Sequence, residues 1–245
     1  MRFEPGAVLR GADLSDTELS DLDLSGAVFE DCTIADRNMS GTRFEDARFS
    51  KCRIIRCRFA SADFRDAIFE QCTFADDQGH VGAQFAFSRL GQARFHRCDL
   101  SFAAFERSDL HALEMETCNL RGATFKNVDF ARSFGKKILR WAGAIRGCNL
   151  ELADLAGLRM PDCDLSNSRF REAVLFDADF EGADLRGCDF GQALIAGARF
   201  ARADVRGADL TGMNLTELAS FNEIKVSMDQ ASQLLTAMGV DVCPE

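Results

Sequence analysis

The sequence predicts a solenoid built from short repeats, and two observations carry this prediction. A large apolar residue recurs at every fifth position over most of the chain, as at Leu9, Leu14 and Leu19. The residue two positions earlier is usually small, most often Ala or Cys. An amphipathic helix places an apolar residue about every 3.6 positions and a half-buried strand every second position, so a five-residue period fits neither. Repetition at one fixed period indicates a repeat protein instead.

Three blocks of this repeat are separated by two interruptions. The blocks are residues 9–74, 85–130 and 145–215. Residues 75–84 are polar, contain glycine and shift the repeat by one position, which indicates a projecting loop. Residues 131–144 leave the phase of the repeat unchanged, so we expect the coil to continue beneath a second projecting loop. We therefore predict one repeat domain over residues 1–215, with loops at 75–84 and 131–144.

The repeat has a recognisable consensus. Its clearest copies, residues 183–187 and 208–212, read Ala-Asp-Leu-Arg-Gly and Ala-Asp-Leu-Thr-Gly. This A(D/N)(L/F)xx pattern resembles the pentapeptide-repeat family. The resemblance implies an all-β fold, a right-handed quadrilateral β-helix with four repeats in each coil, in which the central Leu or Phe and the small residue point inward. Close packing agrees, because each corner of a narrow square tube has room for one large and one small side chain.

Composition narrows the class of protein. The chain is 47% hydrophobic and 28% charged, with a net charge of −10. No apolar run approaches the roughly 18 residues of a membrane span, and the N-terminus does not read as a signal peptide. We therefore expect a cytoplasmic protein.

The cysteines are explained by the repeat. Nine of the ten occupy the small inward position that Ala takes elsewhere, namely Cys32, Cys52, Cys57, Cys72, Cys98, Cys118, Cys148, Cys163 and Cys188, and the tenth is Cys243 in the tail. A buried cysteine behaves as a small apolar residue. Cys32, Cys52 and Cys72 should stack into one column, and Cys98 and Cys118 into another. Because stacking alone gives neither disulfide geometry nor a tetrahedral metal site, we expect no metal, no cofactor and one exposed thiol, in the tail.

No catalytic constellation emerges from the sequence. Tyr is absent, and the three histidines, His80, His96 and His111, have no partner at a spacing that suggests a site. Many Asp residues precede the central Leu or Phe, as at Asp13 and Asp184, but a residue required once per turn serves the turn by accepting backbone hydrogen bonds. No phosphate-binding loop or nucleophile motif is found, and a rod with a filled core lacks a pocket that excludes water. We therefore predict that the chain is not an enzyme.

Acidic residues recur in the first block at the second position after the centre. One-coil spacing stacks Asp16 with Asp36 and Asp46 with Asp66. These columns are either a solvated face that prevents aggregation, or an imitation of a nucleic-acid duplex that competes for a DNA-binding surface. Direct binding of nucleic acid is disfavoured, because phosphates require a basic surface. The net charge of −10 favours a protein partner with basic surfaces.

The second loop is the most basic stretch of this acidic chain and holds its only Trp. Aromatic residues and Arg dominate binding hot spots, and loops on rigid scaffolds commonly carry function. The candidate partner-binding residues are Arg132, Phe134, Lys136, Lys137, Ile138, Arg140 and Trp141 in this loop, and Asp76, Asp77 and His80 in the first loop. In an alternative interpretation, Ile138, Leu139 and Trp141 fold back to cover a face of the rod.

Residues 216–245 no longer follow the five-residue repeat and form the predicted C-terminal segment. Ser227 followed by Gln230 is a capping-box start, apolar residues follow at helical spacing, and Gly239 supplies the stop. We predict a helix that caps the last coil, followed by an extended tail. The leftover apolar surface could also pair two chains about a two-fold axis. The candidate dimer residues are Ala231, Leu234, Leu235, Met238, Val240 and Val242.

Two further segments narrow the resemblance. The first loop is framed by Phe74 and Phe85, and the tail reads Asp-Gln-Ala-Ser-Gln-Leu-Leu from Asp229 and Met-Gly-Val from Met238. Together with the second loop, they resemble the quinolone-resistance (Qnr) branch of the family. This resemblance implies a homodimer joined at its C-terminal ends. It also implies binding to type II topoisomerases, DNA gyrase and topoisomerase IV, and their protection from fluoroquinolones, chiefly through the second loop.

We therefore expect a non-enzymatic protein that binds a topoisomerase and protects it from fluoroquinolones or from a natural topoisomerase toxin. A second hypothesis is a DNA-mimic inhibitor of gyrase, which depends on the acidic columns. A third is a structural or scaffolding rod with an unrelated protein partner. The paired loops and the dimerising tail favour the first hypothesis, because a plain spacer needs neither.

Overall fold

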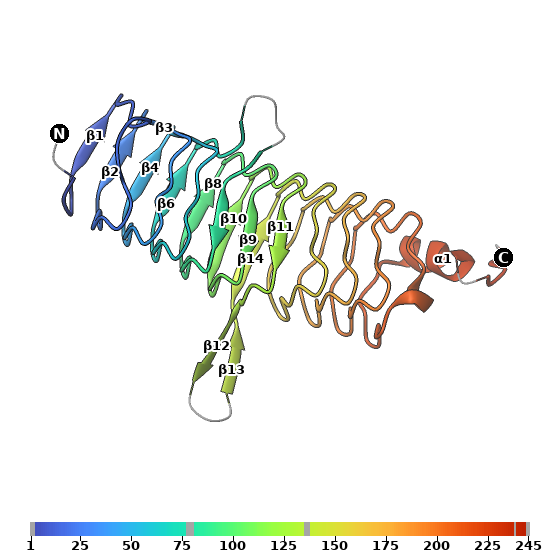
Figure 1. Ribbon diagram of the computed structural model, residues 1–245. Helices are drawn as coiled ribbons and strands as arrows, with labels where there is room; N and C mark the ends of the chain where they lie inside the picture. The colour runs from blue at the N-terminus through green and yellow to red at the C-terminus, as the bar shows by residue number, and fades with distance from the viewer. Residues whose placement is uncertain (1–2, 77–80, 135–137, 238, 244–245) are drawn as a thin grey trace.

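In the computed structural model, the chain winds into a rod whose two termini lie at opposite ends (Figure 1). The structure describes residues 3–76, 81–134, 138–237 and 239–243. The fold is the expected right-handed quadrilateral β-helix with two projecting loops, and the described residues contain a single α-helix at the C-terminal end. The fold class predicted from the five-residue period is therefore confirmed.

One parallel sheet, which we call face A, runs along the first two thirds of the rod. Its strands are β1 (Val8–Arg10), β2 (Val28–Glu30), β4 (Arg48–Ser50), β6 (Ile68–Glu70), β8 (Arg94–His96), β10 (Leu113–Glu116) and β14 (Gly143–Arg146). Each strand pairs with the strand one coil later, so Leu9 lies opposite Phe29, and Phe29 opposite Phe49. Beyond β14, isolated bridges continue this face, the first of them joining Ala144 to Asp164.

The other faces are named in the order in which the chain visits them. Face B contains β3 (Thr33–Ala35) and β5 (Arg53–Ile55), and face C contains β7 (Gln84–Ala86), β9 (Ala104–Glu106) and β11 (Thr124–Lys126). Face D is held by single parallel bridges, beginning with Asp23 to Arg43 and Arg43 to Asp63. The strands are short because the chain turns a corner after every repeat.

Both loops are inserted without breaking the ladder of face A. Leu9 and Phe29 are 20 positions apart, whereas Phe69 pairs with Phe95, 26 positions later, so the first loop adds six residues. Met115 pairs with Ile145, 30 positions later, so the second loop adds ten. Ten residues are two whole repeats, whereas six are one repeat and one residue. This difference explains why only the first loop shifts the phase of the sequence.

Large side chains stacked one coil apart form the core. On face A the rings of Phe29 and Phe49 stack with their centroids 4.5 Å apart, and the rings of Phe69 and Phe95 do the same across the first loop. Each ring is buried. Because an aromatic pair contributes about 0.5–1.5 kcal/mol beyond its buried area, such stacking adds stability at every level where it recurs.

The two cysteine columns predicted from the sequence form one continuous column. The backbone N–H of Cys98 donates to Sγ of Cys118, and that of Cys118 donates to Sγ of Cys148, both at 3.4 Å. Cys72 and Cys98 are also within hydrogen-bonding reach of each other. The columns join because neither loop changes the register in which successive coils pair. The nine inward cysteines are buried and Cys243 is exposed, as expected.

Aspartates serve the corners in two ways. Those before the central residue accept a backbone N–H two positions later, as Asp13 does from Ser15 at 3.0 Å and Asp184 from Arg186 at 3.1 Å. This confirms the turn role predicted for them. Most of those at the second position after the centre adopt positive φ, for example 54° at Asp31. Gly, Asn and Asp reach this region more readily than other residues, so the recurrence of Asp there has a cause in the backbone.

The C-terminal segment caps the last coil. It contains a 3₁₀ turn at Leu215–Glu217 and the helix α1 (Met228–Ala237). The capping box is confirmed, because the Ser227 N–H donates to Oε1 of Gln230 at 2.7 Å. Nε2 of Gln230 then donates to the carbonyls of Val205 and Ala208 at 2.7 and 2.8 Å. No helix in the described part of the chain has the length and apolar character that a bilayer crossing requires.

Candidate partner-binding loops

The two loops leave the rod at opposite corners. The first leaves where face B passes to face C, and the second leaves where face D passes to face A. Figure 1 shows them projecting on opposite sides of the rod. One flat partner surface therefore cannot contact both loops of a single chain at once.

The second loop is a β-hairpin. Its strands β12 (Ala131–Phe134) and β13 (Ile138–Trp141) are antiparallel, with Ala131 opposite Trp141 and Arg132 opposite Arg140. The hairpin stands away from the rod (Figure 1), although Trp141, one of the residues of the fold-back alternative, packs against the core at its base. The described residues of the two strands thus pair with one another, and the coil beneath keeps its register.

The structure separates the candidate residues of this hairpin. Phe134 and Ile138 form the outermost pair of the described ladder, and Arg140 is exposed on β13. Arg132 and Trp141 lie at the base, where the hairpin meets the rod. Lys136 and Lys137 lie outside the described residues.

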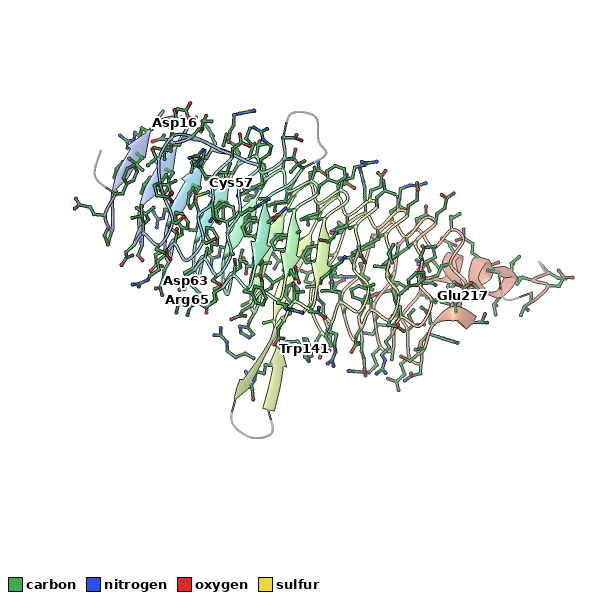
Figure 2. All side chains as sticks on the ribbon, viewed as in Figure 1. Asp16, Cys57, Asp63, Arg65, Trp141 and Glu217 are labelled. Carbon is green, nitrogen blue, oxygen red and sulfur yellow. The ribbon has the colours of Figure 1, made fainter. Side chains whose placement is uncertain are left out.

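Trp141 fills a seam in face D. Among the described residues, the bridges of face D stop at Asp129 and start again at Arg159. Trp141 packs against the core at this level, and the guanidinium carbon of Arg159 lies 4.6 Å from the centroid of its ring (Figure 2). Nε of Arg159 also lies 3.6 Å from Oδ2 of Asp179. Trp141 was predicted as a partner-binding residue. It is half-buried, so in addition it anchors the hairpin to the following coil.

A second anchor joins the hairpin to the preceding coil. Nη2 of Arg132 lies 3.6 Å from Oδ2 of Asp109. Beside them, His111 has a buried Nδ1 atom with no hydrogen-bond partner. Burial, together with the nearby positive charge of Arg132, lowers the pKa of His111. The imidazole is therefore held neutral beneath the hairpin.

Each loop returns to the rod through a glycine that leaves no room for a side chain. A Cβ on Gly82 would lie 2.4 Å from the backbone N of Ala103 and 2.4 Å from the carbonyl carbon of Phe102. A Cβ on Gly143 would lie 2.6 Å from Cδ1 of Phe130. Sequence reasoning missed both glycines, because their neighbours come from other coils or from the far side of an insertion.

The first loop is closed at its base by Asp76. The Asp76 N–H donates to the carbonyl of Val81 at 3.1 Å, and the Val81 N–H donates to Oδ1 of Asp76 at 3.3 Å. Asp76 therefore stabilises the base of the first loop whether or not a partner is bound. Asp77 and His80, the other two candidates in this loop, lie outside the described residues.

The acidic columns are short and partly compensated. Asp16, Asp36, Asp46 and Asp66 are all exposed. Asp36 receives two hydrogen bonds of 2.7 Å from Arg56 one coil later, and hydrogen bonding by Arg56 lowers the pKa of Asp36. Asp66 receives a hydrogen bond of 2.8 Å from Nε2 of Gln92. Each column thus ends on a basic or neutral side chain after two carboxylates.

The described residues contain no group of three or more His, Cys, Asp or Glu side chains arranged to hold a metal ion. Burial raises the pKa of the Cys57 thiol to about 11 and that of Cys188 to about 12, so these inward cysteines disfavour the reactive thiolate. The geometry accordingly defines a β-solenoid that displays projecting loops.

Two models of the pentapeptide repeat match most of this solenoid. One, pentapeptide repeats in eight copies, matches residues 81–112, 145–171 and 173–212. The other, pentapeptide repeats in nine copies, matches residues 5–60 and 40–77. The chain belongs to the pentapeptide-repeat family.

Qnr proteins are among those similar to this chain in sequence and in structure. The chain is 26% identical to the pentapeptide repeat protein QnrB4 of Escherichia coli over 109 residues, which cover 44% of this chain and 51% of that protein. The matched region thus spans about half the length of this relative. A trypsin-treated form of QnrB1, a plasmid-mediated fluoroquinolone resistance protein, is similar with a TM-score of 0.67 at 23% identity, over 98% of this chain and 99% of that one. Full-length QnrB1 is similar with a TM-score of 0.64 at 20% identity, over 97% and 99%.

Proposed function

We propose that this chain is a non-enzymatic protein that binds a type II topoisomerase, DNA gyrase or topoisomerase IV, and protects it from fluoroquinolones. The observation that carries the proposal is the nearly end-to-end likeness to QnrB1, described as a fluoroquinolone resistance protein. The detectable sequence similarity to QnrB4 supports the same branch. The comparisons establish the fold and the family, and the topoisomerase partner and the drug are what we propose.

The hairpin of residues 131–141 is the contact element in this proposal. It projects from the rod, and its base is held to the preceding coil by Arg132 and to the following coil by Trp141 and Arg159. A hairpin whose base is held on both sides projects in a defined direction, which reduces the entropy lost on binding. Contact by the outer part of the hairpin then destabilises the drug-trapped complex of enzyme and DNA.

The charge of the rod supports a basic partner surface. With a net charge of −10, the chain is attracted to positively charged surfaces over distances of about 10 Å at moderate salt. Type II topoisomerases carry such surfaces because they bind DNA. We therefore expect association to weaken as the salt concentration rises.

A supercoiling assay with gyrase and a fluoroquinolone tests the proposal. Titrating the protein should restore supercoiling. In a truncated variant, residues 133–139 are replaced by Asn-Gly, a pair that closes tight hairpins, so that Arg132 and Trp141 keep their anchoring positions. This variant should fold as the parent by circular dichroism and lose protection. No protection by the parent overturns the function, and full protection by the truncated variant overturns the role of the hairpin.

The DNA-mimic alternative rests on Asp16, Asp36, Asp46 and Asp66. The pairing of Asp36 with Arg56 reduces the negative charge that such a mimic would display. Replacing all four with Asn should leave protection intact if the hairpin acts. Inhibition of gyrase without drug by the parent, lost in this variant, would assign the protein to DNA mimicry instead.

We also propose that two chains pair through their C-terminal ends. Leu235, Val240 and Val242 remain exposed there, at 42%, 46% and 40%. Ala231 is partly buried and Met238 lies outside the described residues. Leu234, predicted for this interface, is buried against the last coil and belongs to the cap instead.

Light scattering of a Leu235→Asp variant tests this pairing. The substitution places a charge in the proposed interface and should convert a dimer into a monomer without changing the circular dichroism spectrum. Gln233→Asp, at an exposed polar position of the same helix, is the matched control and should remain dimeric. A parent protein that is monomeric at all concentrations rules the pairing out.

A further inference from the structure

One repeat breaks the rule that the inward position is uncharged. Arg37 stands two positions before the central Met39, where the other repeats of the three blocks carry no charged residue. A guanidinium does not fit in a filled core, because burying an unpaired charge is costly. The side chain is accordingly only partly buried, and its Nε donates to the carbonyl of Ala35 at 3.2 Å.

A cavity of about 390 Å³ lies beside Arg37. It opens at the corner between faces B and C, directly beneath the return of the first loop. Its lining residues are Asp36, Arg37, Asn38, Arg56, Cys57, Arg58, Val81, Gly82 and Gln84. The buried Cys57 is labelled in Figure 2. Three arginines and one acidic residue line this cavity, which makes it a basic site in a chain of net charge −10.

The donors of the cavity are set in fixed positions by the coil. Asn38, Arg58 and Gln84 lie one above another on face C, joined by parallel bridges. One coil step is about 4.8 Å, so their side chains are within reach of one bound group. Oδ1 of Asn38 accepts from the N–H and the hydroxyl of Ser40, at 3.3 and 2.5 Å, which leaves its amide N–H groups to face a ligand.

The charges around the cavity are incompletely compensated. Arg56 is paired with Asp36 through two hydrogen bonds of 2.7 Å. Arg37 uses Nε for a carbonyl, so with respect to the described residues its terminal N–H groups remain for another acceptor. Glu18 is an acidic group near Arg37 that lies outside the cavity. An Arg guanidinium offers five N–H donors in a fork that matches the oxygens of phosphate and carboxylate groups.

We propose that this cavity binds an oxyanion, a phosphate or a carboxylate group, held by Arg37 and Arg58 with the amides of Asn38 and Gln84. Arg56 adds positive charge, and Asp36 holds Arg56 in place. The return of the first loop through Val81 and Gly82 forms one wall, so a bound anion also contacts the loop. This site is independent of the proposed topoisomerase binding and is tested on the isolated protein.

The test follows the arginine Nε–Hε signals of the ¹⁵N-labelled protein by NMR. Inorganic phosphate is titrated against a chloride control of equal ionic strength, and a glutamate-rich peptide is titrated in a second series. Saturable movement of the Arg37 signal with phosphate alone assigns the site to phosphate groups, and movement with the peptide alone assigns it to carboxylates. Movement with both assigns it to oxyanions in general. Equal movement with chloride, or none in any series, overturns the proposal.

Two variants make the assignment specific. Arg37→Ala restores the residue type that the repeat uses at this position, so it should fold, and it should bind the effective anion about tenfold more weakly. Arg48→Ala removes an exposed arginine from face A and should bind as the parent does. Equal affinity of the parent and the Arg37→Ala variant, with both shown to be folded by circular dichroism, contradicts the proposed site.

Discussion

The two loops interrupt the same coil in different ways. The first adds six residues and is closed at its base by hydrogen bonds between Asp76 and Val81, whereas the second adds ten, forms a paired hairpin and is anchored to the coils on both sides. The second loop therefore has a defined base and a defined direction. The difference teaches that both insertions leave the ladder intact but are held differently. The insertion of two whole repeats forms a paired hairpin that projects from the rod, whereas the shorter insertion is closed at its base by hydrogen bonds of Asp76.

The largest expected effects come from the glycines at which the loops return. Gly82→Ala should destabilise the protein by about 3 kcal/mol, because the new Cβ meets the backbone of the next coil, which cannot move aside. Gly143→Ala should cost less, about 1–2 kcal/mol, because it meets the edge of the Phe130 ring. Urea denaturation followed by circular dichroism measures both.

A matched control separates steric conflict from backbone strain. Gly157 has a φ of 68° and nothing within 4 Å of the position of a Cβ, so Gly157→Ala carries only the left-handed strain of about 1 kcal/mol. If all three variants lose the same stability, the close approach at the loop returns is not what selects glycine there.

Smaller effects are expected at the anchors of the hairpin. Arg159→Ala removes the cation over Trp141 and should loosen the hairpin by about 1 kcal/mol, or about fivefold faster amide exchange. Arg132→Ala breaks a partly exposed ion pair and should have an effect of about 0.5 kcal/mol or less. Hydrogen exchange over residues 131–141 measures both, with Arg169→Ala, an exposed arginine on face B, as the control. Unchanged exchange in both variants would mean that strand pairing alone holds the hairpin.

The closure of the first loop should respond only locally. Asp76→Ala removes the acceptor of the Val81 N–H and should cost about 0.5–1 kcal/mol. Amide exchange at Val81 should accelerate, while exchange in the hairpin stays as in the parent. Faster exchange in the hairpin would show that the two loops are coupled, in spite of their positions at opposite corners.

A pH dependence should distinguish the base of the second loop. The pKa of His111 is lowered in the folded chain by burial and by Arg132, so the unfolded chain, with an ordinary pKa of about 6.5, binds the proton more readily. The contribution of His111 to stability is complete above that pH and is lost as the pH falls toward the lowered value. His111→Gln should flatten the change in the denaturation midpoint between about pH 7 and 5. An equally steep change in the variant would place its origin elsewhere.

Much of the fold could be predicted because each repeat has the same local requirements. The five-residue period, the aspartates at the corners and the capping box of Ser227 and Gln230 are all local features, and the structure confirms them. Features that depend on the course of an insertion could not be predicted in the same way. The seam that Trp141 fills depends on how the second insertion rejoins the rod, which the repeat does not specify.

Some signals in the sequence were present and were overlooked. Arg37 at an inward position is visible from the repeat alone, and it marks the one corner cavity lined by three arginines among the described pockets. The continuity of the cysteine column could also have been predicted. The ten residues of the second insertion are two repeats, so Cys118 and Cys148 had to fall on the same corner.

The ladder that passes beneath both insertions makes the corners of this rod suitable sites for grafting. Because Met115 pairs with Ile145 as if the hairpin were absent, the coil requires only that the two ends of an insertion meet at neighbouring positions. Foreign hairpins of other lengths could be displayed at the same corner, provided that Gly143 and the anchoring Trp141 are kept. The spacing between two displayed segments would then be set in steps of one coil, about 4.8 Å each.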